Sequence, residues 1–131
     1  MLKKVRGIIY DTKDGQPYFL IFHRVLHWKG WELMKETIES KETNEQALIR
    51  GIKEETKLKD FKIIKSLDKQ EKWQALGNEY FVVDTFLIKA DMNQKISLGN
   101  EHDSYQWANK EEAIKKLTHA KSKDLIWNSL N

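Results

Sequence analysis

Two apolar runs joined by a turn and followed by one strongly capped helix most constrain what this chain can fold into. Residues 5–10 and 18–22 are almost entirely apolar, which is typical of strands covered on both faces. Asp14-Gly15 between them favours a β-hairpin. Thr43 and Gln46 match a capping box, in which their side chains satisfy the first free N–H groups of a helix. We predict this helix from about residue 44 to about residue 56.

The rest of the chain adds strands and then helices, after a segment at residues 25–41 that we expect to be irregular. Residues 61–64 and 80–88 are predicted to be strands with a charged loop between them. Asn109 is expected to begin a short helix through Leu117, and Ser122 a last helix ending near Leu130. Helices and strands do not alternate regularly, so the order predicts an α+β fold, an α/β/α sandwich with a mixed central sheet, and not a doubly wound fold.

Composition narrows the function without defining it. The 131 residues include no cysteine, which excludes disulfides, a thiol nucleophile and Cys-ligated zinc. No apolar run approaches the roughly 20 residues that span a bilayer, so we expect a cytoplasmic protein that does not enter membranes. The net charge of +3 is compatible with an anionic ligand such as a nucleotide or RNA. No repeat or linker divides residues 1–131, so one domain is predicted.

The five tryptophans and four histidines are scattered through the chain. Trp107 and Trp127 are predicted to be core residues. The histidines lack the spacing of metal ligands, so no histidine is expected in a metal site.

The predicted helix presents an acidic face. At about 100° per residue, Arg50, Glu54 and Glu55 lie on one arc around Gly51, while Thr56 lies on the far side. Adjacent carboxylates suit hard divalent cations, which take oxygen ligands and bridge to substrate phosphates. Glutamate-rich helix faces are nevertheless common as solvated surface, so the spacing alone leaves both interpretations open.

The order of residues through this region resembles the Nudix box. Seven residues separate Glu42 from Arg50, as in the box. The positions in register with it are Glu42, Arg50, Ile52, Glu54, Glu55 and Leu58. Outside the box, Trp31-x-Leu33-x-Lys35 and Glu101-His102-x-x-Tyr105-x-Trp107 are similar to motifs of the diadenosine tetraphosphate hydrolase branch of the Nudix family.

The resemblance implies a Nudix-type sandwich and hydrolysis of a diphosphate linkage in a nucleoside polyphosphate, dinucleoside tetraphosphate-like, with Mg²⁺ or Mn²⁺. It implies that Glu54, Glu55 and Glu101 hold metal and that Glu54, Glu55 and Arg50 are catalytic. Arg50 either orients the glutamates or clamps Glu42. The implied substrate contacts are Lys35 with the polyphosphate, and Trp31 and Tyr105 with a base.

The box is broken at four positions. Glu36 replaces its first glycine, Lys41 a glycine before Glu42, Gly51 a glutamate, and Lys57 its last glycine. The lost glutamate at Gly51 leaves two alternatives: the remaining carboxylates suffice, with Glu36 as a conceivable substitute, or the protein is a non-catalytic module that binds nucleotide or RNA or scaffolds a complex. A third alternative is hydrolysis of triphosphorylated RNA 5′ ends at the same site.

Overall fold

A computed structural model describes residues 2–74, 77 and 79–130 of the chain. The elements, in chain order, are β1 (Leu2–Lys13), β2 (Gln16–Arg24), β3 (Gly30–Glu32), β4 (Met34–Thr37), α1 (Asn44–Thr56), β5 (Phe61–Gln74), β6 (Tyr80–Ala90), β7 (His102–Asn109), α2 (Lys110–Lys116) and α3 (Ala120–Asn128). Within the described residues, no helix is both long and apolar enough to cross a membrane.

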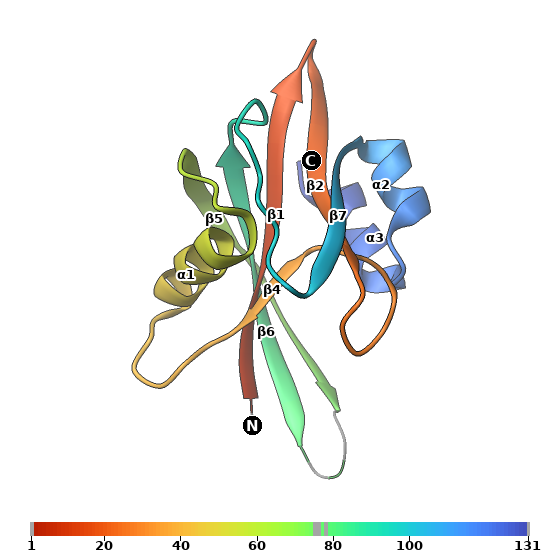
Figure 1. Ribbon diagram of the computed structural model, residues 1–131. Coiled ribbons are helices and arrows are strands. Elements are labelled where there is room, and N and C mark those ends of the chain that lie inside the picture. Colours follow the sequence, from red (N-terminus) through yellow and green to blue (C-terminus); the bar gives the residue numbers. More distant parts are fainter. Residues whose placement is uncertain (1, 75–76, 78, 131) are drawn as a thin grey trace.

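The strands form one mixed sheet of seven strands (Figure 1). Its path runs β3-β2-β1-β6-β5, with β4 paired to β1 and β7 paired to β2. The pair β1 and β6 is parallel and the other pairs are antiparallel. The predicted α+β sandwich with a mixed sheet is confirmed.

The hairpin between β1 and β2 forms as predicted. Asp14 and Gly15 both have positive φ, 53° and 77°, as the favoured two-residue hairpin turn requires. The two strands pair only near this turn, between Tyr10↔Phe19 and Lys13↔Gln16. Beyond it they diverge, and the segment β3–β4 lies between them, with β3 on β2 and β4 on β1. This division of the sheet creates the edge at which the polar site is built.

Two cores cover the two faces of the sheet, which makes the three layers. Helix α1 covers one face and α2 with α3 the other (Figure 1). Strand β1 alternates between them, because Val5 and Ile9 pack with α1 whereas Ile8 packs with α2 and α3. Burial of both faces explains why residues 5–10 read as one apolar run.

The capping box of α1 is confirmed, with the Gln46 backbone N–H donating to Thr43 Oγ1 at 3.1 Å and the Thr43 N–H donating to Gln46 Oε1 at 3.0 Å. The predicted orientation of Thr56 is wrong, because its side chain is buried and its hydroxyl donates to the Ile52 carbonyl oxygen at 2.6 Å. Thr56 follows Ile52 by one helical turn, so it extends the buried stripe instead of opposing it.

Four other expectations are corrected. Residues 25–41 are not irregular throughout, since they contain β3 and β4, and the charged residues after 64 continue β5 to Gln74. Helix α3 begins at Ala120 instead of Ser122, which is buried. Trp107 packs half-buried against the α1-side core as expected. Trp127 does not belong to the core, because its exposed fraction is 60%.

Candidate functional site

Three potential metal ligands meet beside the C-terminal half of α1. Glu55 comes from α1, Glu101 precedes β7, and His102 is the first residue of β7. Each offers one ligand atom, and these atoms lie within 4.8 Å of one another. Two of the three predicted metal residues, Glu55 and Glu101, are thus brought together with a histidine that the sequence analysis set aside.

Two buried atoms of this cluster face each other without a partner. Glu55 Oε2 and His102 Nδ1 are 3.7 Å apart, and within residues 2–74, 77 and 79–130 neither makes a hydrogen bond. The other ring nitrogen, His102 Nε2, lies 2.8 Å from Glu32 Oε2. Because a carboxylate only accepts, Nε2 carries the proton in the neutral imidazole and Nδ1 presents a lone pair. A cation between Nδ1 and Glu55 Oε2 would satisfy both atoms, so the residues fit a divalent metal.

Glu32 fixes the orientation of this imidazole and is itself held by an arginine. Arg24 Nη1 donates to Glu32 Oε2 at 3.0 Å and lies 3.6 Å from Glu101 Oε2. Burial alone would raise the pKa of Glu32, but the hydrogen bonds from His102 and Arg24 outweigh it and hold that pKa below its usual range. Glu32 is therefore a fixed negative charge behind the histidine.

The catalytic candidates Glu54 and Glu55 have different surroundings although they are adjacent. The Glu55 side chain is 16% exposed and that of Glu54 is 57% exposed. Burial raises the pKa of Glu55, and the negative charge of Glu101 raises it further, while His102 opposes the shift. Among the described residues, Glu54 does not belong to the group of potential metal ligands formed by Glu55, Glu101 and His102.

Arg50 joins α1 to the loop that precedes it. Its Nε donates to Glu42 Oε2 at 2.7 Å and its Nη2 to Glu42 Oε1 at 3.0 Å and to the Thr37 carbonyl oxygen at 2.9 Å. Its Nη1 also lies 3.4 Å from Glu54 Oε2. The guanidinium contacts both partners that the sequence suggested, and the forked pairing with Glu42 is the tighter one.

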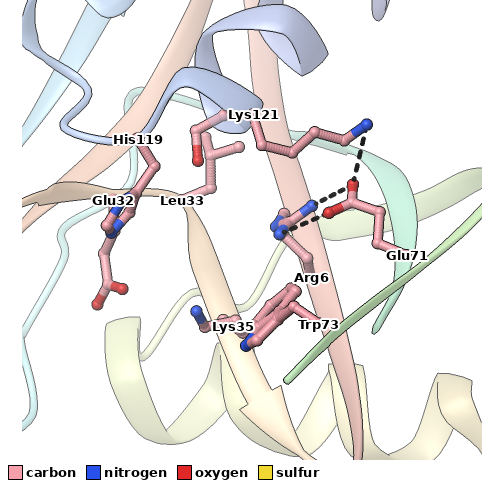
Figure 2. Close-up of a pocket in the computed structure, with 9 residues that line it drawn as sticks. Arg6, Glu32, Leu33, Lys35, Glu71, Trp73, His119 and Lys121 are labelled. Atoms are coloured by element: carbon pink, nitrogen blue, oxygen red, sulfur yellow. Dashed lines mark hydrogen bonds and ion pairs between the residues drawn. The ribbon is translucent and has the colours of Figure 1, made fainter. Parts of the chain in front are cut away.

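A pocket of about 360 Å³ adjoins the cluster and includes Lys35 (Figure 2). Its charged and aromatic lining is Arg6, Glu32, Lys35, Glu71, Trp73, His119 and Lys121. Glu32 lines the pocket and also lies at hydrogen-bond distance from His102 of the cluster. The pocket and the cluster therefore form adjacent parts of one region.

The pocket carries three cationic side chains against two carboxylates and has an aromatic wall. Arg6 pairs with Glu71 at 2.9 Å, and Lys121 Nζ lies 3.8 Å from Glu71. Lys35 Nζ and Arg6 Cζ lie 5.2 and 5.9 Å from the ring centroid of Trp73. Burial lowers the pKa of Lys35, Glu32 opposes this, and the charges of Lys4, Arg6 and Arg24 add to the lowering. Binding an anion here would relieve the repulsion between the cations.

Trp31 and Tyr105, the predicted base-stacking residues, lie elsewhere. The Trp31 ring is 5.2 Å from that of His23 and has Lys116 Nζ 4.9 Å from its centroid. Tyr105 is 40% exposed on β7. Neither belongs to the described lining of the pocket that contains Lys35.

The sequence analysis missed Arg6, Glu32, Glu71, Trp73 and His102. Trp73 gave one signal, as a lone aromatic two residues after Glu71 in an otherwise charged stretch. His102 gave another, because it follows Glu101 in the motif that resembles the diadenosine tetraphosphate hydrolase branch.

Comparisons with known proteins identify the family of the chain and proteins that share its fold. The chain matches the family model described as NUDIX domain over residues 1–127. It is similar to the Ap4A hydrolase of C. elegans in a binary complex, with a TM-score of 0.82 and 24% identity over 97% of this chain and 93% of that chain. The dihydroneopterin triphosphate pyrophosphohydrolase of E. coli gives a TM-score of 0.80 and 18% identity over 95% of this chain and 91% of that chain.

A third similar structure is the NUDIX domain of Shewanella oneidensis NrtR complexed with ADP ribose, with a TM-score of 0.76 and 15% identity over 98% of this chain and 86% of that chain. No curated protein matches the sequence significantly.

Proposed function

The chain belongs to the NUDIX domain family, and from this premise we propose that it is a hydrolase that cleaves a diphosphate linkage in a nucleoside polyphosphate. The proposed substrate is dinucleoside tetraphosphate-like, and the proposed cofactor is Mg²⁺ or Mn²⁺. The observation that carries the proposal is the pair of buried, unpartnered atoms on Glu55 and His102 beside a cationic pocket. One half of this region suits a divalent cation and the other suits phosphates.

In this proposal Glu55, Glu101 and His102 hold the metal, and Glu54 contributes its negative charge from the exposed side. A bound divalent cation would neutralise phosphate oxygens and lower the pKa of a water molecule. Arg50 keeps Glu54 and the loop at Glu42 in place through its paired hydrogen bonds. Arg50 is thus proposed to act by positioning, as a clamp between α1 and the preceding loop.

The pocket would hold the part of the substrate that does not react. Lys35, Arg6 and Lys121 supply positive charge to bridging phosphates. Trp73 offers an aromatic face to a base. Arg6 and Lys35 cover this face in the structure. A dinucleotide has a second base that this pocket would not hold. Trp31 and Tyr105, which do not line the pocket, remain the proposed contacts for that second base. A cytoplasmic location belongs to the same proposal.

Two names among the similar structures support this class of substrate. One belongs to an Ap4A hydrolase and another to a triphosphate pyrophosphohydrolase. These activities belong to those proteins, and structures with such low sequence identity to this chain show only a shared fold. The substrate class is therefore to be tested directly.

The test is product release from diadenosine tetraphosphate, nucleoside triphosphates and ADP-ribose, with Mg²⁺, with Mn²⁺ and with EDTA. We expect metal-dependent release that Glu55→Gln abolishes and that Glu45→Gln, an exposed change in the first turn of the same helix, leaves intact. If no combination of metal and substrate gives turnover, the enzymatic proposal is wrong.

Gly51 favours a second candidate, a nucleotide- or RNA-binding module without catalysis. Calorimetric titration in EDTA distinguishes it, because nucleotide binding that persists without metal and yields no product would support the module. Triphosphorylated RNA oligonucleotides in the same assays test whether an RNA 5′ end is the substrate.

A further inference from the structure

Gly51 lies on the buried face of α1, where strand β4 fills the space that a side chain would need. A Cβ atom at position 51 would lie 2.5 Å from Met34 Cε and 3.0 Å from both Cβ and Cγ of Glu36. Such contacts are shorter than ordinary carbon–carbon separations. The stem of Glu36 therefore occupies the place next to the helix that Gly51 leaves free.

The same stem carries the Glu36 carboxylate to Arg50 of α1. In β4, Glu36 pairs with Val5, whose side chain packs with α1, so both residues share that face of the sheet. The Glu36 side chain is 20% exposed, with Oε1 3.6 Å from Arg50 Nη1 and accepting from the Thr37 backbone N–H at 3.0 Å. Glu36 thus lies in front of α1 next to Arg50.

Glu36 also interacts electrostatically with the cluster. It is among the charges that raise the pKa of Glu55. Burial raises the pKa of Glu36 itself, Arg50 opposes this, and Glu54 and Glu101 add to it. The Arg50 guanidinium compensates part of this negative charge, but Glu36 shares it with Glu39, Glu42 and Glu54. A further cation would relieve the remaining repulsion between the half-buried carboxylates.

We propose that Glu36 supplies, from strand β4, the carboxylate that α1 lacks at Gly51. Its carboxylate lies outside the cluster of Glu55, Glu101 and His102 among the described residues, and it would turn from Arg50 to hold a divalent cation together with Glu55 and Glu101. The glutamate gained at position 36 would then compensate for the glutamate lost at position 51. A separate observation points to a cation here: His102 Nδ1, on a side chain only 5% exposed, faces Glu55 Oε2 with neither atom bonded within the described residues.

This inference rests on the proposed function, so its test measures metal binding without substrate. Mn²⁺ affinity is measured by electron paramagnetic resonance on the whole chain after removal of metal with EDTA. We expect Glu36→Gln to weaken Mn²⁺ binding by about tenfold or more. Glu39→Gln is the matched control, because Glu39 Oε1 also lies 3.6 Å from Arg50 Nη1 but its side chain is 67% exposed. It should change the affinity by less than about twofold.

This compensation gives a second test. Gly51→Glu alone should lower the melting temperature, because its Cβ would meet Glu36 and Met34. The double variant Glu36→Gly, Gly51→Glu removes the Glu36 stem and leaves only the flexible end of Met34 to move. We expect it to bind Mn²⁺ within about threefold of the original chain.

Three results would overturn the inference: unchanged affinity in Glu36→Gln, equal losses in Glu36→Gln and Glu39→Gln, or a folded double variant that binds as weakly as Glu36→Gln. If the original chain still binds Mn²⁺, each of these three results contradicts the role of Glu36 but not the proposed function. If the original chain does not bind Mn²⁺ at millimolar concentration, both proposals fail.

Discussion

Glu55→Gln should stabilise the protein in the absence of metal while removing its response to metal. At present Glu55 Oε2 and His102 Nδ1 face each other at 3.7 Å, and each presents a lone pair when the imidazole is neutral. A glutamine amide places an N–H donor in this gap and needs to close it by less than about 1 Å to reach hydrogen-bond distance. The change therefore supplies partners to both atoms and removes one charge from the cluster.

The magnitude follows from the number of unsatisfied atoms. Each buried polar atom left without a partner costs about 1–3 kcal/mol. Because the new amide relaxes imperfectly into the gap, we expect a gain of about 1–2 kcal/mol in the free energy of unfolding. For a domain of this size, that corresponds to a rise in Tm of roughly 4–8 °C.

The stabilisation expected from Glu55→Gln depends on pH. The pKa of Glu55 is raised by burial and then by Glu101, so between its ordinary and its raised value the folded state binds more protons than the unfolded state. The stability of the original chain therefore falls as pH rises through this window. Below the window, protonated Glu55 can itself donate to His102 Nδ1, and the advantage of Glu55→Gln should disappear.

The assay is thermal unfolding in EDTA at pH 4 and pH 8, repeated with Mn²⁺ at pH 8. Glu54→Gln is the control, because the Glu54 side chain is 57% exposed and its loss should change stability by less than about 0.5 kcal/mol. Mn²⁺ should stabilise the original chain and not Glu55→Gln. Equal Tm values for these two proteins in EDTA at pH 8 would refute the reasoning and indicate that water already satisfies both atoms.

The other predictions concern neighbouring parts of the site. Arg50→Lys loses the forked pairing with Glu42, so urea denaturation should show a loss of about 1–3 kcal/mol. Lys35→Met should weaken nucleotide binding by about tenfold or more in calorimetry, whereas Trp73→Phe, which keeps an aromatic face, should weaken it by less than Trp73→Ala. Gly51→Ala should cost about 1–3 kcal/mol in thermal unfolding, because its Cβ would lie 2.5 Å from a methionine methyl group. If any of these variants gives the same value as the original chain, the contact from which that prediction was made does not contribute as proposed.

The features that the sequence predicted well are those set by residues close together in the chain. The capping box at Thr43 fixes the start of α1 through bonds across three residues, and Asp14-Gly15 supplies the two positive φ values of the hairpin. The spacing of Glu42 and Arg50 likewise reflects a contact over eight positions, from the loop before α1 to the helix itself. Local chemistry determines each of these, so no distant partner had to be known.

The missed features depend on distant partners. The charged continuation of β5 becomes a strand because it pairs with β6 as far as Gln74↔Tyr80, and β3 and β4 form because β1 and β2 diverge. His102 has no ligand-like spacing along the chain. It enters the cluster through the hydrogen bond to Glu32, 70 positions away. Sequence spacing alone contains no sign of such contacts.

Glu32 explains why the two halves of the site lie together. It ends β3 at the place where β1 and β2 have separated, so it is buried, 5% exposed, while still lining the pocket. Its carboxylate accepts from Arg24 and lies at hydrogen-bond distance from His102 Nε2. By keeping the proton on Nε2, it leaves Nδ1 free to face Glu55, and its negative charge is the first of those acting on Lys35. One buried carboxylate thus orients the histidine of the proposed metal cluster and partly offsets the cations of the pocket. This coupling depends on the division of the sheet.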